Sequence, residues 1–275
     1  MYTLNCNGNP LLIDRPLIMG ILNYTGDSFY AGSRLKSDYE VIQKAIQFAD
    51  QGADILDIGA QSTRPGSERL SSEEEIQKLR GIIPLLKKQT GKLISVDTYH
   101  AGVAQFAVAS GADIINDISG GTMDEKMIET VGRPKVPYIC MHIKGTPEDM
   151  QQRTDYGDIL KELLNFFIER IAKCKEAGIH DVIIDPGIGF AKTISQNFYL
   201  IKNLSVFRIL ERPILIGASR KSFIYRSLGV EASEALNGTT VMNTLALQNG
   251  VEILRVHDVK EAAETVKLMK CYQEA

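Results

Sequence analysis

The feature that most limits the possible folds of this chain is an eightfold alternation of short apolar runs with longer amphipathic segments. The apolar runs lie at residues 17–23, 55–59, 93–97, 114–118, 137–142, 182–185, 213–217 and 251–257. They show no regular polar alternation, which is typical of parallel strands covered on both faces. Eight strands that alternate with helices predict an α/β fold, the (β/α)8 TIM barrel, because eight is the number at which such a sheet closes.

Turn and capping signals delimit the elements. Asn7-Gly8, between two short strand-like runs, predicts a small β-hairpin over residues 2–13. A hydroxyl residue followed three positions later by glutamate predicts a helix start. This pattern occurs at Ser37 with Glu40, Ser71 with Glu74, and Thr122 with Glu125. Pro84 is expected to kink its helix or to end the first part of it. No linker interrupts the pattern, so we expect one domain over residues 1–275.

Composition excludes several classes of partner. The 31 Lys and Arg residues are balanced by 34 Asp and Glu residues, the net charge is -3, and no basic stripe is present, so nucleic acid is not an expected partner. No apolar run is long enough to span a bilayer, and we expect no membrane association. The four cysteines lack metal-binding or redox spacing, which favours a reduced, cytoplasmic protein.

A polar residue ends almost every predicted strand. Ligand sites of such barrels lie at the carboxyl ends of the strands, so these residues are expected to face one cavity. They are Asn23, Asp57, Asp97, Asn116 with Asp117, His142, Asp185, Ser219 with Lys221, and Arg255 with His257. Charges that directly follow apolar runs are costly unless they are paired, so the ring indicates a polar ligand.

Two chemistries can be separated within this ring. One group mixes hydrogen-bond acceptors with amide and ammonium donors, which suits a flat heterocycle with a donating and an accepting edge. Its members are Asp97, Asn116, Asp185 and Lys221. Arg255 and His257 occupy alternate positions of the last strand and suit an anion.

Simpler roles stay open for some of these residues. Asp57 could only pin a loop, Asp117 is expected to face away from Asn116, and His142 is as readily structural as a ligand. His100 and His180 are expected at ordinary surface positions. Residues 24–36 and 61–70 are long, polar and glycine-bearing, as mobile lids over a barrel mouth tend to be.

The motifs at the strand ends resemble those of the dihydropteroate synthase family. The resemblance extends from about residue 17 to residue 260, with the motifs in family order and each at its own strand. They are MGILNYTGDSF, STRPG, SVDT, IINDIS, MHIKGTP, DPGIGFAKT, SRKSF and RVHDV. The combination is much more specific than any one motif.

The resemblance implies that p-aminobenzoate displaces diphosphate from a dihydropterin diphosphate, with Mg²⁺ as cofactor, and that the enzyme is a homodimer formed through late helices of the barrel. By position it implies Asp97, Asn116, Asp185 and Lys221 for the pterin, and Asn23, Arg255 and His257 for the diphosphate, with Asn23 also on the metal. It implies Thr63, Arg64, Pro65, Phe190, Lys221 and Ser222 for p-aminobenzoate. The catalytic residues would be Asp97, Lys221, Arg255 and His257.

The chain departs from the family pattern in its two polar loops. Gly26 stands where proline is usual and Tyr24 where valine is common, and Ala60-Gln61 replaces Gly-Glu before STRPG. These departures concern the ordering of the loops and the affinity for p-aminobenzoate and sulfonamides. Two alternatives stay open: a related pterin-binding methyltransferase, and a catalytically silent paralogue that binds pterins.

Overall fold

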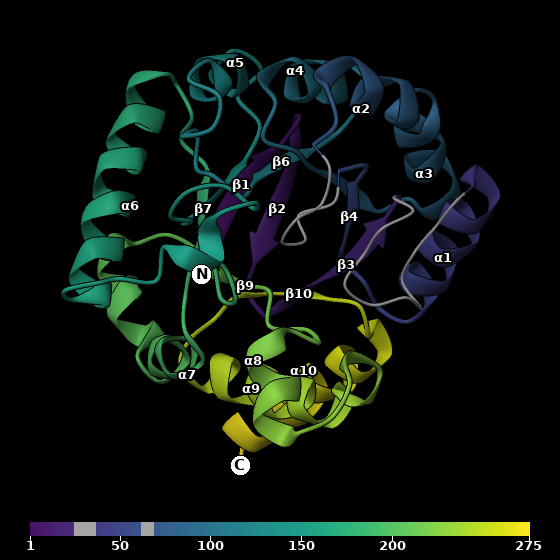
Figure 1. Cartoon of the computed structure of the whole chain (residues 1–275). Helices are drawn as coiled ribbons and strands as arrows, with labels where there is room; N and C mark the ends of the chain where they lie inside the picture. Colours follow the sequence, from purple (N-terminus) through teal and green to yellow (C-terminus); the bar gives the residue numbers. More distant parts are fainter. Residues whose placement is uncertain (25–36, 62–68) are drawn as a thin grey trace.

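A closed ring of parallel strands surrounded by helices forms the body of the protein (Figure 1). The computed structural model describes residues 1–24, 37–61 and 69–275. Gly26, Thr63, Arg64 and Pro65 lie outside the described residues, as do most of the two predicted lids.

The eight parallel strands are arranged in the order β8-β7-β6-β5-β4-β3-β10-β9. They are β3 (Leu17–Asn23), β4 (Ile55–Gly59), β5 (Leu93–Asp97), β6 (Ile114–Asp117), β7 (Tyr138–Met141), β8 (Val182–Asp185), β9 (Leu215–Ile216) and β10 (Ile253–Val256). A parallel bridge between Ile184 and Ile214 joins β8 to the chain just before β9 and closes the ring. The predicted (β/α)8 barrel is confirmed.

Helices follow the strands and cover the outside of the ring. They are α1 (Asp38–Asp50), α2 (Ser72–Leu79), α3 (Ile82–Thr90), α4 (Ala101–Ala109), α5 (Met127–Gly132), α6 (Ile159–Glu176), α7 (Ile194–Lys202), α8 (Ser222–Leu228), α9 (Leu236–Gln248) and α10 (Val259–Gln273). In the part of the chain that the structure describes, short 3-10 helices lie between them: η2 (Met150–Gln152), η3 (Leu204–Leu210) and η4 (Ala232–Glu234). Within the described ranges, no helix is long and apolar enough to cross a membrane.

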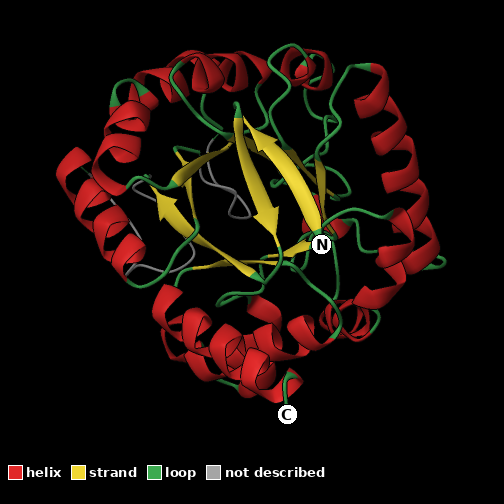
Figure 2. Cartoon of the chain, turned by 180° about the vertical axis from the view of Figure 1, so that it is seen from behind, coloured by secondary structure: helices red, strands yellow, loops and turns green. Residues whose placement is uncertain are grey.

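The predicted hairpin is present and lies across one end of the barrel (Figure 2). Its strands β1 (Tyr2–Cys6) and β2 (Asn9–Ile13) pair antiparallel. The turn places Asn7 at φ 51° and Gly8 at φ 86°, the left-handed region that Asn-Gly tolerates best. The buried face of the hairpin packs on the lowest apolar layer inside the barrel, so the hairpin plugs the end opposite the carboxyl ends of the strands.

Two of the three predicted capping pairs stand at helix starts. Ser37 caps α1, and Ser71 forms a reciprocal capping box with Glu74 at α2. The prediction for Thr122 is wrong, because the hydroxyl of Thr122 donates to the carbonyl of Ser119 over 2.9 Å and α5 begins only at Met127. Pro84 lies in the first turn of α3, where proline is tolerated, and the predicted break falls between α2 and α3.

Side-chain alternation along the strands creates two apolar cores. Outward-facing residues pack against the helices in the larger core, which contains Leu56, Val96 and Ile115. Inward-facing residues fill the lower barrel with Met19, Ile55, Ile114, Ile139, Ile183, Leu215 and Ile253. Because successive side chains alternate between faces, the residue two positions further along each strand also points inward, one layer higher. The polar site is built in that layer.

A buried carboxyl group lies outside the barrel, on the inner face of α2. Glu75 is fully buried, and the side chain of Thr98 offsets part of the cost of burying its carboxyl group. Burial raises the pKa of Glu75 to about 8, and the negative charge of Asp97 adds to the shift. Folded protein therefore keeps a proton on Glu75 through a pH range in which the unfolded chain releases it.

We predict that Glu75→Gln removes a pH-dependent loss of stability. Between the ordinary pKa of 4.5 and about 8, the folded state binds the extra proton. The unfolding free energy of the wild type should therefore fall by up to about 1.4 kcal/mol per pH unit as the pH rises through this window. Denaturant unfolding at pH 5 and pH 8 tests this: the advantage of Glu75→Gln should grow towards pH 8, and an equal difference at both pH values would contradict it.

Candidate active site

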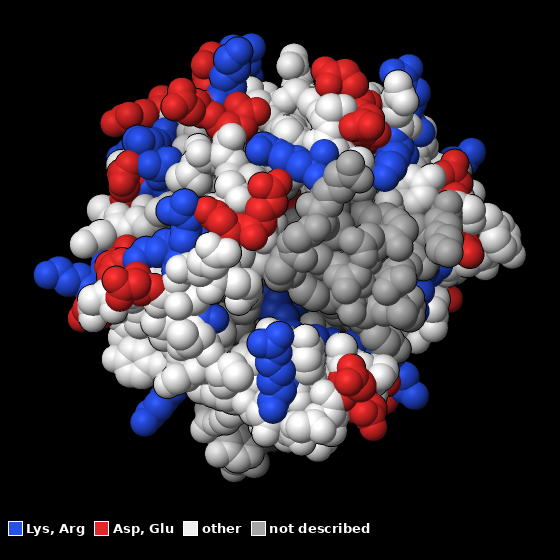
Figure 3. Space-filling view, viewed as in Figure 1, with Lys and Arg blue, Asp and Glu red and all other residues white. Residues whose placement is uncertain are grey.

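The inward-facing layer above the apolar barrel floor carries the polar side chains. Asp57, Asn116, Asp185 and Arg255 each stand two positions after an apolar residue of the inner core. Asp97 pairs in register with Asn116 on the neighbouring strand. The expected ring is therefore real for these five residues, and basic side chains are visible at the centre of the barrel in Figure 3.

Arg255 connects strands of this layer that are not neighbours in the sheet. Its Nε donates to Asp57 Oδ2 and its Nη2 to Asp97 Oδ2, both over 2.6 Å. The amide of Asn116 donates to the same Asp57 oxygen over 3.1 Å. Asp57 does not pin a loop, because it is fully buried within β4 and orients two other residues of the site. Its second oxygen, Oδ1, has no hydrogen-bond partner among the described residues.

The electrostatics of this cluster favour a ligand that donates hydrogen bonds. Burial raises the pKa of Asp97 to about 7; the charge of Arg255 opposes this shift, and the charge of Asp57, which also pairs with Arg255, adds to it. An arginine that serves two carboxyl groups cannot fully compensate either of them. Together with the buried orphan oxygen of Asp57, this arrangement leaves unused acceptor capacity within the cluster.

Asp185 and Lys221 form a second polar group on the far wall. Asp185 accepts from the backbone N–H of Gly187 over 2.8 Å. The ammonium of Lys221 donates to the carbonyl of Ile188 and lies 4.2 Å from the ring centroid of Phe190. Burial lowers the pKa of Lys221 to about 7, with Asp185 opposing the shift, and burial raises the pKa of Asp185, with Lys221 opposing it. The two side chains therefore support each other's charge.

His257 is oriented by Ser219. The backbone N–H of His257 donates to Ser219 Oγ over 3.2 Å, and His257 Nδ1 lies 3.0 Å from the same oxygen. A hydroxyl that accepts the backbone hydrogen can donate its own to Nδ1, which puts the ring proton on Nε2. Burial lowers the pKa of His257 to about 3, and the charge of Arg255 adds to the shift. The ring is thus a neutral donor at neutral pH.

Arg220, which immediately precedes Lys221 in the sequence, does not join the site. Its backbone adopts φ 53°, and its guanidinium makes a bidentate pair with Asp258 at 2.8 and 3.0 Å. It also donates to the carbonyls of Ala232 and Ser233. These bonds tie the start of α8 to the end of β10 and so fix the position of Lys221.

Asp117 and the three remaining histidines lie outside this polar layer or at its edge. Asp117 faces outward as expected and accepts from Tyr138 Oη at 2.6 Å and from the Gly121 N–H at 2.7 Å. His142 is buried, with Nδ1 3.3 Å from Lys192 Nζ. His180 is exposed as expected, but His100 is half-buried, with Nε2 3.2 Å from the carbonyl of Leu70, so its assignment to an ordinary surface position is wrong.

The remaining predicted site residues lie around this centre. Asn23 is the half-buried last residue of β3, Ser222 opens α8, and Phe190 belongs to an apolar cluster with Met141 and Ile143. The predicted loop residues Thr63, Arg64 and Pro65 lie outside the described part of the chain.

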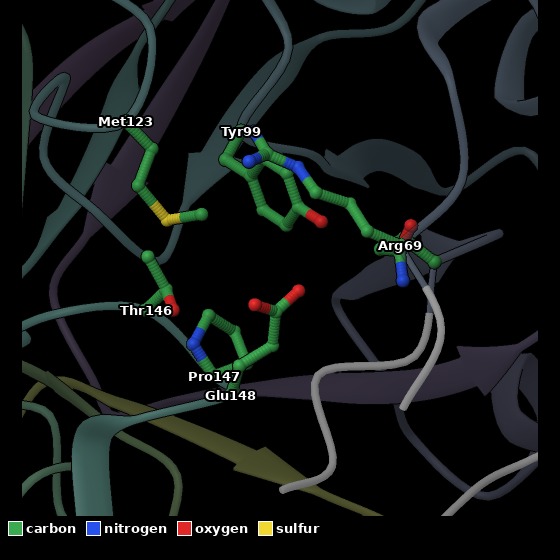
Figure 4. Close-up of a pocket in the computed structure, with 7 residues that line it drawn as sticks. Arg69, Tyr99, Met123, Thr146, Pro147 and Glu148 are labelled. Carbon is green, nitrogen blue, oxygen red and sulfur yellow. The ribbon is translucent and has the colours of Figure 1, made fainter. Parts of the chain in front are cut away.

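A small recess lies at the rim, at the ends of β4 to β7 (Figure 4). Its lining residues are Gln61, Arg69, Tyr99, Met123, Thr146, Pro147 and Glu148. The guanidinium of Arg69 stacks 4.9 Å above the ring of Tyr99. Gln61, which replaces the family's glutamate, accepts from the Leu70 N–H over 2.7 Å. Sequence reasoning missed Arg69 and Tyr99, because nothing in their spacing indicates that they meet.

Comparison with known proteins gives consistent matches over nearly the whole chain. Residues 19–257 match the family described as Pterin binding enzyme. The chain is 42% identical over 257 residues to a dihydropteroate synthase of Synechocystis sp., covering 92% of this chain and 89% of that protein. It is 42% identical over 258 residues to the dihydropteroate synthase of Bacillus subtilis, covering 93% and 88%.

Solved structures agree with these sequence matches. The Yersinia pestis dihydropteroate synthase, solved as a complex with a sulfonamide drug, superposes with a TM-score of 0.96 at 34% identity, covering 100% of both chains. The Xanthomonas albilineans dihydropteroate synthase with 4-aminobenzoic acid gives a TM-score of 0.91 at 36% identity, covering 99% of this chain and 98% of that one. The same enzyme in complex with 7,8-dihydropteroate gives 0.86 at 31% identity, covering 99% of both.

Proposed function

This chain belongs to the dihydropteroate synthase family, and we propose that its barrel mouth joins (7,8-dihydropterin-6-yl)methyl diphosphate to p-aminobenzoate, giving 7,8-dihydropteroate and diphosphate. The enzyme is then a transferase of an alkyl group other than methyl. The observation that carries the proposal is the set of acceptors and donors formed by Asp97, Asn116 and Asp185 at the carboxyl ends of their strands and by Lys221 at the start of α8, in a chain of this family. The relatives named above are synthases, so a methyltransferase is not favoured.

Complementary hydrogen bonding would hold the pterin. The carboxyl group of Asp185 suits the N–H donors of the pterin edge, while the amide of Asn116 and the ammonium of Lys221 can donate to ring acceptors. Asp57 holds the amide of Asn116 from below, which fixes the direction in which Asn116 presents its remaining groups. Specificity for a flat, amidine-containing heterocycle follows from this arrangement.

The reaction needs no covalent enzyme intermediate. The amine nitrogen forms a bond to the methylene carbon while the bond from that carbon to the diphosphate oxygen breaks, and the bonding electrons leave with diphosphate. The pterin ring spreads the positive charge that develops on the carbon, and Asp97 is suited to stabilise that charge. The product nitrogen then loses a proton. Phe190 and Ser222 would form the wall for the aminobenzoate ring.

The diphosphate would lie at the ends of β3 and β10. The neutral ring of His257 offers an Nε2 donor for a phosphate oxygen, and Arg255 adds positive charge below it. Asn23 supplies a hard oxygen donor of the kind that Mg²⁺ accepts beside substrate phosphates, and bound Mg²⁺ would neutralise charge on the leaving group. The magnesium ion and the cytoplasmic location expected from the sequence stay predictions.

A turnover assay tests the proposed function. Diphosphate release from the pterin diphosphate should require p-aminobenzoate, and 7,8-dihydropteroate should appear in equal amount. Binding of the pterin without any p-aminobenzoate-dependent release would instead support a silent pterin-binding protein.

We predict that His257→Ala selectively weakens the diphosphate substrate. Its affinity should fall about tenfold, the effect of one lost charge-assisted hydrogen bond. The affinity for 6-hydroxymethyl-7,8-dihydropterin, which lacks the diphosphate, should change less than about twofold because no such bond is lost. Calorimetry with both ligands gives the ratio, and the exposed His180→Ala variant is the control. Equal weakening of both ligands would show that His257 supports the fold and does not bind the anion.

We also propose that the enzyme forms a homodimer through α7 to α10. These helices lie side by side on one flank of the barrel (Figure 1). With η3 they expose several large apolar side chains, which a monomer would leave in water. They are Ile194, Phe198, Tyr199, Val206, Ile209, Leu228, Val241, Leu245, Leu268 and Tyr272.

We predict that Leu245→Glu dissociates this dimer. Leu245 and Val241 stand one turn apart on the exposed side of α9, and a charge buried at a closely packed twofold interface lacks a partner. Sedimentation velocity should give twice the chain mass for the wild type and the monomer mass for the variant. Ile168→Glu, which changes an exposed aliphatic residue on α6, is the matched control and should stay dimeric. A monomeric wild type would contradict the proposal.

A further inference from the structure

The turn that follows β8 sets the orientation of two site residues. Its Gly187 N–H donates to Asp185, and its Ile188 carbonyl accepts from the ammonium of Lys221. Phe190, three residues after Gly187, places its ring against the same ammonium. A small displacement of this turn would therefore move Asp185, Lys221 and the apolar wall together.

The backbone of the turn adopts left-handed φ angles at several positions. Gly187 and Gly189 adopt φ 71° and 83°, and Ala191, which is not glycine, adopts φ 49°. A side chain at Gly187 is impossible, because its Cβ would lie 2.0 Å from the carbonyl oxygen of His142. A non-glycine residue in the left-handed region costs on the order of 1 kcal/mol or more, so the surrounding contacts must hold the turn in place.

Lys192 supplies those contacts from inside the protein. The residue is 4% exposed, and its Nζ lies 3.0 Å from the carbonyl oxygens of Gly187 and Phe190 and 3.3 Å from His142 Nδ1. An ammonium has three hydrogens, and here three acceptors surround it. Burial lowers the pKa of His142 to about 2, and the charge of Lys192 adds to the shift, so the imidazole is neutral and its Nδ1 can accept.

The two carbonyls that Lys192 binds flank the carbonyl that Lys221 uses. Gly187 and Phe190 lie on either side of Ile188 in the sequence, so fixing both ends directs the Ile188 oxygen towards Lys221. Asn197 holds the other side of the turn, because its Oδ1 accepts from the Gly189 N–H over 2.6 Å. Burial lowers the pKa of Lys192 to about 7, with the charge of Asp185 opposing the shift, so Lys192 is the basic member of this pair of supports.

We propose that Lys192 is a positioning residue of the synthase, which holds the turn at residues 186–191 and thereby sets the aminobenzoate side of the site. The inference rests on the proposed function. Lys192 acts through Lys221 and Phe190 and does not touch the substrate, since protein acceptors surround its ammonium. Asp97 and Asn116 stand on β5 and β6, away from this turn, so two of the four proposed pterin residues do not depend on Lys192.

Lys192→Met tests this with a side chain of similar length and no charge. Two carbonyls and an imidazole nitrogen lose their donor, so the KM and the calorimetric Kd for p-aminobenzoate should rise about tenfold. The Kd for 6-hydroxymethyl-7,8-dihydropterin should rise less, by at most about threefold, because Asp97 and Asn116 stay in place while Asp185 and Lys221 shift with the turn. Lys161→Met, on the exposed side of α6, is the matched control and should change neither constant.

Lys192→Arg provides a second test in case the Lys192→Met variant does not fold. The arginine keeps the positive charge, but its planar guanidinium cannot direct hydrogens to three converging acceptors, so the aminobenzoate constants should still rise several-fold. Either folded variant with aminobenzoate constants within twofold of the wild type would overturn the proposal. So would equal weakening of both ligands, which indicates general support of the barrel mouth. A wild type without turnover contradicts the proposed function instead, and the role of Lys192 is then decided by the two calorimetric affinities.

Discussion

The arrangement of this site depends on one guanidinium shared between two buried carboxyl groups. Arg255 reaches from β10 across β3 to Asp57 on β4 and Asp97 on β5. Removing a single partner from such a cluster would leave an uncompensated buried charge, which typically costs about 3 to 5 kcal/mol. The cluster therefore fixes where charge can lie within the barrel and presents the remaining acceptor capacity to a ligand.

The apolar layers around this cluster hold it in place and close the barrel on one side of it. The hairpin β1–β2 and the inner apolar residues close the barrel from below. The outward-facing residues anchor the strands to the helices, and Asp117 holds the turn after β6 through the Gly121 N–H and joins it to Tyr138 on β7. In a low-dielectric site of this kind each fixed charge acts strongly on a bound substrate, and little reorganisation is needed during the reaction.

Much of this could be predicted from the sequence. Four strands begin and end at the same residues as their apolar runs. Asn116, Asp185 and Arg255, predicted to face one cavity from the ends of their strands, all lie on the inner face of the barrel. β9 is shorter than its apolar run, since Pro213 at the start of that run lacks an N–H for the sheet. The role of Asp57 could not be read from the sequence, because the reach of Arg255 across a strand depends on the curvature of the closed barrel. The role of Arg220 could not be predicted either, since its left-handed backbone turns the side chain away from Lys221 and towards Asp258.

A double-mutant cycle between Asp57 and Arg255 tests whether the shared guanidinium and its carboxyl partner act as one unit. The kcat/KM for the pterin diphosphate is measured for wild type, Asp57→Asn, Arg255→Ala and the double variant. If the two residues act as one unit, the double variant loses little more than Arg255→Ala alone, and the coupling free energy is roughly 0.5 to 3 kcal/mol. Additive losses would contradict the account, because they would mean that Asp57 and Arg255 contribute to the reaction independently.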